Sequence, residues 1–233
     1  MVENQNSELF DSHAGSYKRD VNKAIGFTGM SVDFFTRVKA SYIEDICSSH
    51  FGGMAALDAL DVGCGVGSFH SLLAPRFGNL TGIDVSSASI SEARERHSSV
   101  RYEVYDGMKL PYPDESFDVA FTICVMHHVE PRLWRNFSSE FRRVIKKGGL
   151  GLVFEHNPRN LLTMKAVNNC EFDADATLLR SDTTVQLLRE AGFQEAAASF
   201  ILTVPALNPF MRSVDKWFSG LPLGAQYYVR AVK

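Results

Sequence analysis

The chain has 233 residues, of which 45% are hydrophobic and 22% are charged, and its formal net charge is −3. This length and balance indicate one α/β domain with additions, able to bury an ordinary hydrophobic core. Lysines and arginines are scattered singly or in pairs and form no basic run, which argues against a nucleic-acid partner.

The cysteines show no spacing typical of a zinc site, so we expect no metal site, no disulfide framework and reduced thiols. The first residues are polar and acidic, unlike a signal peptide. No apolar run approaches the roughly 20 residues that a membrane span needs. We therefore expect a cytoplasmic protein without a membrane span, and the sequence does not indicate its oligomeric state.

Residues 1–50 are interpreted as an amino-terminal helical lead-in or cap. A helix is predicted from Ser31 to His50, because its apolar residues recur at helical spacing. Those residues are Phe35, Val38, Tyr42, Ile43 and Ile46.

Residues 51–233 are interpreted as a Rossmann-like domain, because short apolar runs alternate there with helical segments. Strands are predicted at Ala56–Val62, Leu80–Asp84, Val100–Val104, Phe117–Val125 and Leu150–Glu155. Helices are predicted between them, at Ser68–Arg76, from Ser86 or Ser87 to His97, and from Pro131 to Lys146 with a stop at Gly148–Gly149. This alternation predicts a doubly wound, mostly parallel sheet with helices on both faces.

The carboxyl-terminal part of the chain has a different pattern. Ser181 is expected to cap a helix to Ala191, and Phe193–Val204 and Ala225–Val232 are strand-like. Prolines and glycines break up the connection between these two strands, which are expected to pair antiparallel at the sheet edge. A short helix in that connection would place apolar side chains along one side, and we expect them to pack on the core; a lid over an apolar substrate and a membrane-surface contact are the alternatives. These side chains are Phe210, Val214, Trp217, Phe218 and Leu221.

The central motif is the glycine-rich segment LDVGCGVG, which runs from Leu60 to Gly67 at a strand-to-helix turn. Its GxGxG spacing differs from the GxGxxG that seats a pyrophosphate in dinucleotide-binding proteins. Asp61 precedes the first glycine, and its charge would repel a pyrophosphate but attract an ammonium group. The loop is therefore better suited to the ammonium group of a methionine moiety than to the pyrophosphate of a nicotinamide dinucleotide.

Two further acids end the next two predicted strands. Asp84 follows the second strand, where a carboxylate can accept hydrogen bonds from both hydroxyls of a ribose. Asp106 follows the third strand, placed to accept a hydrogen bond from an adenine amino group. Each acid alone can be a turn former or a helix cap, but all three lie where doubly wound sheets bind ligands.

The order of these motifs resembles the small-molecule branch (type 11-like) of the class I S-adenosylmethionine-dependent methyltransferases. The likeness runs from about Leu57 to Phe193 and includes LDVGCGVG, GIDVS, YDGMKLPYPDESFDVAF, VMHHV and RVIKKGGLGLVFEH. It implies the cofactor S-adenosyl-L-methionine and a seven-stranded sheet of order 3-2-1-4-5-7-6 with strand 7 antiparallel. The cofactor-binding residues that it implies are Asp61, Gly63, Cys64, Gly65, Gly67, Asp84, Val85, Asp106, Gly107, Met108 and Cys124.

The amino-terminal segment also resembles this family. Phe10, Asp11, Ala14 and Tyr17 resemble its "FD..A..Y" entry, in which the tyrosine often closes over the cofactor. A partly buried surface aromatic is an equal interpretation of Tyr17.

The acceptor side is less well defined. His127 and His128 follow the fourth predicted strand and His156 follows the fifth, so each is a candidate general base, although a structural role is compatible with each. Glu155 can equally be a strand end that meets solvent. Residues 157–180 and 205–224 are additions to the minimal fold. Insertions at these two places commonly build the acceptor pocket in this family.

We therefore expect an enzyme that transfers a methyl group from S-adenosylmethionine to O, N or C of a small-molecule acceptor. The alternatives are a lipid-linked or macromolecular acceptor and a non-catalytic S-adenosylmethionine-binding protein. A nicotinamide-dependent oxidoreductase is disfavoured because the GxGxxG spacing is absent.

Overall fold

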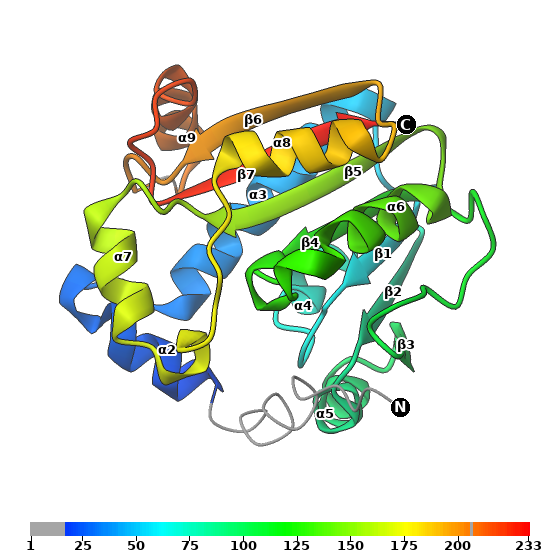
Figure 1. Cartoon of the computed structure of the whole chain (residues 1–233), viewed down its shortest axis with the longest axis horizontal. Helices are drawn as coiled ribbons and strands as arrows, with labels where there is room; N and C mark the ends of the chain where they lie inside the picture. The colour runs from blue at the N-terminus through cyan, green and yellow to red at the C-terminus, as the bar shows by residue number, and fades with distance from the viewer. Residues whose placement is uncertain (1–16, 206) are drawn as a thin grey trace.

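A computed structural model describes residues 17–205 and 207–233 and shows a seven-stranded sheet of order β3-β2-β1-β4-β5-β7-β6 (Figure 1). Strand β7 is antiparallel to both β5 and β6, and the other pairs are parallel. The predicted fold and strand order are therefore confirmed. The strands are β1 (Asp58–Val62), β2 (Asn79–Asp84), β3 (Arg101–Val104), β4 (Phe117–Ile123), β5 (Ile145–His156), β6 (Glu195–Ile201) and β7 (Gln226–Val232).

Helices cover both faces of the sheet, as Figure 1 shows with α6 and α8 in front and α3 behind. They are α2 (Tyr17–Ile25), α3 (Val32–Phe51), α4 (His70–Leu73), α5 (Ser87–Arg96), α6 (Trp134–Val144), α7 (Leu161–Asn168), α8 (Ser181–Glu190) and α9 (Pro209–Trp217). Short 3₁₀ turns are η1 (Gly26–Thr28), η2 (Met126–His128), η3 (Pro131–Leu133) and η4 (Glu171–Asp173).

The core has two parts, one on each face of the sheet. Under α6 and α8, Phe141 and Leu188 pack with side chains of β4 and β5. On the other face, Val38 and Ile43 of α3 pack with α4 and α5. α3 thus contributes buried side chains to the same core as the sheet, and the division of the chain at residues 50 and 51 stays a prediction.

Local signals placed most elements within a few residues. Ser31 caps α3 and Ser86 caps α5, each accepting a backbone N–H as a cap residue should. Two details were wrong. β5 begins already at Ile145, so Gly148 and Gly149 lie inside a long strand and do not end a helix. Ser181 is the first residue of α8, and the cap position before it is occupied by Arg180, which makes no side-chain capping hydrogen bond.

Helix α9 does not pack with its apolar side on the core, so that prediction was wrong. Phe210 and Trp217 are 74% and 84% exposed, whereas Asp215 on the opposite side is fully buried. Asp215 accepts hydrogen bonds from the hydroxyl of Tyr42 and from the backbone N–H groups of residues 202–204. This buried carboxylate anchors α9 to α3 and to the end of β6, and the apolar side is left facing outward.

No helix in the part of the chain that the structure describes is long and apolar enough to cross a membrane. The cytoplasmic location stays a prediction. Of the family's leader motif, Phe10, Asp11 and Ala14 lie outside the described residues, and Tyr17 is described only as the first residue of α2.

Candidate functional site

A cavity of about 1050 Å³ opens at the carboxyl ends of β1, β2, β4 and β5 and extends under α2, α3 and α7. This is the position where open α/β sheets bind ligands. The predicted cofactor residues that line it are Asp61, Gly63, Cys64, Gly65, Asp84, Val85, Asp106, Gly107, Met108 and Cys124. Gly67 does not line it, and the side chain of Tyr17 is outside the described part of the chain.

The glycine loop needs two of its glycines for distinct reasons. Gly63 has φ 78°, and a Cβ there would lie 2.5 Å from the side chain of Val125. A Cβ on Gly67 would lie 2.8 Å from the hydroxyl of Tyr102. Gly63 therefore allows the loop to pass close to the turn after β4, and Gly67 allows it to pack on β3.

The carboxylate of Asp84 is held in a fixed orientation at the end of β2. One oxygen accepts the backbone N–H of Gly65 at 2.8 Å, and the other accepts that of Ser86 at 2.9 Å. Burial raises the pKa of Asp84, and these backbone hydrogen bonds oppose that rise. A carboxylate has about four lone-pair sites, so Asp84 can accept a further donor beside these backbone groups, as a ribose clamp requires.

Asp61 is almost completely buried and is the first member of a chain of polar side chains. His70 Nε2 lies 3.0 Å from Asp61 Oδ2, and His70 Nδ1 lies 2.5 Å from the hydroxyl of Tyr102. Burial raises the pKa of Asp61, and the hydrogen bond from His70 opposes the rise. The sequence did not predict this use of His70, which fixes the acid beside the glycine loop.

Asp106 forms a turn and also lines the cavity. Its Oδ1 accepts the backbone N–H groups of Met108 and Lys109 at 2.8 and 2.9 Å, so it forms the turn after β3. It also lines the cavity together with Gly107 and Met108. The turn therefore presents the acid and the exposed thioether of Met108 to the same space.

Lys39 of α3 is a site residue that sequence reasoning missed. It is only 7% exposed and lines the cavity. Its Nζ lies 3.7 Å from Cys124 Sγ and 5.5 Å from the centre of the Phe69 ring. Among the residues that the structure describes, no carboxylate forms an ion pair with it. A buried ammonium without a counter-ion is costly, so this position suits an anionic ligand group.

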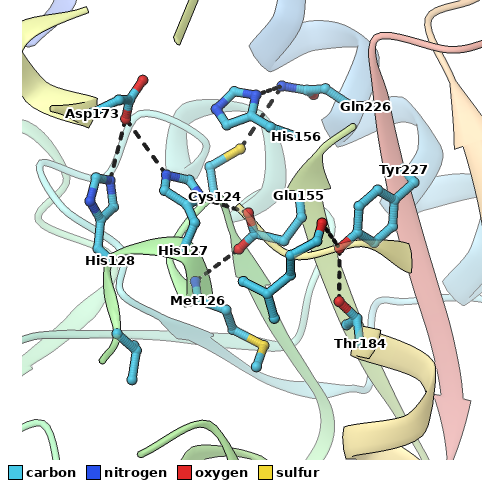
Figure 2. Close-up of polar contacts among 12 residues, drawn as sticks. Cys124, Met126, His127, His128, Glu155, His156, Asp173, Thr184, Gln226 and Tyr227 are labelled. Atoms are coloured by element: carbon cyan, nitrogen blue, oxygen red, sulfur yellow. Dashed lines mark hydrogen bonds and ion pairs between the residues drawn. The ribbon is translucent and has the colours of Figure 1, made fainter. Parts of the chain in front are cut away.

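Glu155 of β5 and His127 of the turn after β4 form a buried pair, and His127 lines the cavity (Figure 2). His127 Nδ1 donates to Glu155 Oε2 at 2.5 Å, and Glu155 Oε1 accepts the backbone N–H of Met126 at 2.8 Å. Glu155 is 1% exposed, so the alternative of a strand end meeting solvent was wrong. It is held inside because β7 pairs with β5 along its outer edge, through Tyr227 opposite Glu155.

Asp173 of η4 joins the histidines from across the cavity. Its Oδ1 lies 3.6 Å from His127 Nε2 and 3.5 Å from His128 Nε2, and Figure 2 shows both rings turned toward it. His156 lies beside them, with Nδ1 3.4 Å from Gln226 Nε2. Thus all three predicted histidines line one cavity, with two carboxylates next to them.

The three histidines have different environments. Burial alone would lower the pKa of His127, but the charges of Glu155 and Asp173 outweigh it and raise that pKa to about 10. Burial and the neighbouring His127 lower the pKa of His128 to about 3 and that of His156 to about 4. At neutral pH the cluster therefore holds its proton on His127, between the two carboxylates.

A family model described as a methyltransferase domain matches residues 60–153. Over 134 residues the chain is 34% identical to 2-methyl-6-phytyl-1,4-hydroquinone methyltransferase of Synechocystis, covering 54% of this chain and 41% of that one. It is 30% identical over 209 residues to 24-methylenesterol C-methyltransferase 2 of rice (Oryza sativa), covering 84% of this chain and 54% of that one. The chain thus spans about half the length of these curated relatives, or less.

A crystal structure from Thermotoga maritima has a similar fold. It is described as an S-adenosylmethionine-dependent methyltransferase, possibly a histamine N-methyltransferase. Its TM-score is 0.71 at 21% identity, and the likeness covers 97% of this chain and 99% of that one. Residues 60–153 match this methyltransferase domain family, and the sheet order and glycine loop of the chain agree with the fold expected of class I S-adenosylmethionine-dependent methyltransferases.

Proposed function

We propose that the chain transfers the methyl group of S-adenosylmethionine to a small-molecule acceptor. The observation that carries this proposal is one continuous cavity with two chemically different ends. The first end has the glycine loop and the acids of β1 and β2. The second has the histidines and Asp173. Donor and acceptor would therefore meet without leaving the protein, as an in-line displacement requires.

The first end fits each polar part of the cofactor. Asp84 would accept the ribose hydroxyls and Asp61 would attract the ammonium of the methionine moiety. Lys39 would pair with its carboxylate, which supplies the anion that this buried ammonium lacks among the described residues. Asp106 stays the proposed acceptor for the adenine amino group. Bound there, the cofactor supplies an electrophilic methyl group on a sulfonium.

The second end favours an acceptor with an apolar body and a polar reacting group. Its wall includes the apolar side chains of Leu162, Val167 and Leu223. Apolar side chains also continue onto the surface near α7, where Leu161 is 85% exposed. The names of the relatives specify a phytyl-bearing hydroquinone and a sterol, both largely apolar. We propose an acceptor of this kind that is methylated on oxygen, nitrogen or carbon.

The histidine cluster would orient that reacting atom. The ring nitrogens of His127 are directed at Glu155 and Asp173, and Nε2 of His128 also faces Asp173. His156 lines the cavity beside them and would be the imidazole best placed to contact the acceptor. If the acceptor must lose a proton during attack, one of these groups receives it. Otherwise the cluster contributes by alignment and by exclusion of water.

Methyl transfer from labelled S-adenosylmethionine to a panel of acceptors tests the proposal. The panel contains long-chain phenols, sterols and amines, each paired with a short-chain analogue of the same reacting group. We expect stoichiometric label in a long-chain product and S-adenosylhomocysteine as co-product. Cofactor binding with no transfer to any member would instead support a binding protein without catalysis. Transfer that does not depend on chain length would contradict the apolar acceptor.

A further inference from the structure

His127, His128 and Asp173 place three metal-ligand atoms together at the acceptor end of the cavity. Their side-chain donor atoms all lie within 4.8 Å of one another (Figure 2). We propose that these three residues bind one divalent transition-metal ion. The inference deepens the proposed function, because the ion would face the acceptor, but metal binding can be measured without methyl transfer.

The distances between the donor atoms fit one shared ion. Asp173 Oδ1 is 3.6 Å from His127 Nε2 and 3.5 Å from His128 Nε2. Metal–nitrogen and metal–oxygen bonds of about 2.0–2.2 Å place neighbouring ligands roughly 3–3.5 Å apart. Small side-chain movements would therefore bring all three atoms onto one ion. These side chains are 1%, 9% and 12% exposed, so each is already held in the protein interior.

Glu155 provides the support that metal-bound imidazoles usually have. It accepts a hydrogen bond from His127 Nδ1 at 2.5 Å, which directs Nε2 of the same ring toward Asp173. Carboxylates in this position orient metal-ligating histidines and raise their basicity. The other oxygen of Glu155 is held by the backbone N–H of Met126. Glu155 thus holds one nitrogen of the His127 ring, and the other nitrogen of that ring would bind the metal ion.

The ligand set indicates both the class of ion and its purpose. Two imidazoles and one carboxylate suit Zn²⁺, Co²⁺, Ni²⁺ or Fe²⁺ better than Mg²⁺ or Ca²⁺, which prefer oxygen. Three protein ligands leave coordination positions open, and all three residues line the cavity. An acceptor oxygen or nitrogen would occupy such a position and be held beside the methyl donor.

The expectation of no metal site rested on the cysteines, which take no part here. The proposed ligands are instead two adjacent histidines and an aspartate from η4. These residues have no characteristic spacing in the sequence, because the tertiary fold and not a local motif brings them together.

Cobalt titration tests the site directly. The full chain, prepared without a histidine tag and freed of metal with a chelator, is titrated with Co²⁺ and followed by visible absorption. We expect one Co²⁺ per chain with the absorption bands of a protein-bound ion, and displacement by Zn²⁺. Absence of a bound ion at millimolar Co²⁺ would show that the cluster is a hydrogen-bond network alone, and would overturn the proposal.

Variants test the ligand assignment. Asp173→Ala and His128→Gln should each weaken Co²⁺ binding at least about a hundredfold, and Glu155→Gln about ten- to a hundredfold. The control His50→Ala removes a histidine outside the cavity and should still bind one ion. Retained S-adenosylhomocysteine binding shows that each variant is folded. Unchanged Co²⁺ affinity in both Asp173→Ala and His128→Gln would contradict the site.

The two proposals fail in distinguishable ways. Methyl transfer by a chain that binds no Co²⁺ would overturn the metal site and leave the proposed function intact. One bound Co²⁺ in a chain that methylates no acceptor would support the site and contradict the function.

Discussion

Glu155 and His127 form a hydrogen-bonded pair, Nδ1 to Oε2 at 2.5 Å, in which each side chain is about 1% exposed. One residue comes from β5 and the other from the turn after β4. Charged groups that are buried together stabilise a fold only while both are present, because the survivor otherwise keeps its desolvation cost. Loss of either side chain should therefore both alter the acceptor end of the cavity and lower the stability of the fold.

The first prediction follows from this pair. Glu155→Gln removes the charge but keeps the size, and it should lower the free energy of unfolding by about 3 kcal/mol. Urea unfolding at neutral pH measures the difference. Glu195→Gln, at an exposed position of β6, is the matched control and should change stability by less than about 0.5 kcal/mol. Equal effects of the two substitutions would mean that the buried pair is not strongly coupled.

The second prediction concerns the ribose clamp. Asp84→Ala removes the charged acceptor of two hydroxyls, and hydrogen bonds to charged groups contribute about 1.5–3 kcal/mol. The affinity for S-adenosylhomocysteine should fall about ten- to a hundredfold in calorimetry. Asp106→Ala should weaken binding more than Asp106→Asn, which keeps a carbonyl acceptor. Parent-like affinity of Asp84→Ala would place the ribose elsewhere.

The third prediction assigns Lys39 to the carboxylate of the cofactor. Lys39→Met keeps an apolar stem and removes the charge, so S-adenosylhomocysteine should bind about ten- to a hundredfold more weakly. 5′-Methylthioadenosine lacks that carboxylate and should bind parent and variant alike. A similar loss for both ligands would show that Lys39 acts through the shape of the cavity and not through its charge.

How far the sequence predicted this site depended on how local each signal was. The strands, the glycine loop and the acids Asp61, Asp84 and Asp106 all follow local patterns, and the structure places these acids on one cavity. Lys39, Asp173 and the partners of Glu155 were missed because only the packing of α3, η4 and β7 brings them to the cavity. The apolar side of α9 was misjudged for a related reason, since the buried Asp215 and not an apolar residue anchors that helix.

The fourth prediction addresses proton transfer. Of His127→Ala, His128→Ala and His156→Ala, at least one should lower turnover about a hundredfold or more with cofactor binding retained, because general bases contribute about 10²–10⁴-fold. Turnover is measured at saturating cofactor and acceptor to separate catalysis from binding. Near-parent turnover in all three variants would mean that the acceptor is already nucleophilic when it binds and that alignment alone is required.

The central claim is that the cavity beside the glycine loop holds S-adenosylmethionine, and calorimetry on the full chain tests it most directly. The account predicts that one S-adenosylhomocysteine binds per chain, that Asp84→Ala weakens this binding, and that NAD has no comparable affinity. Saturable NAD binding, with no heat from S-adenosylhomocysteine, would contradict it.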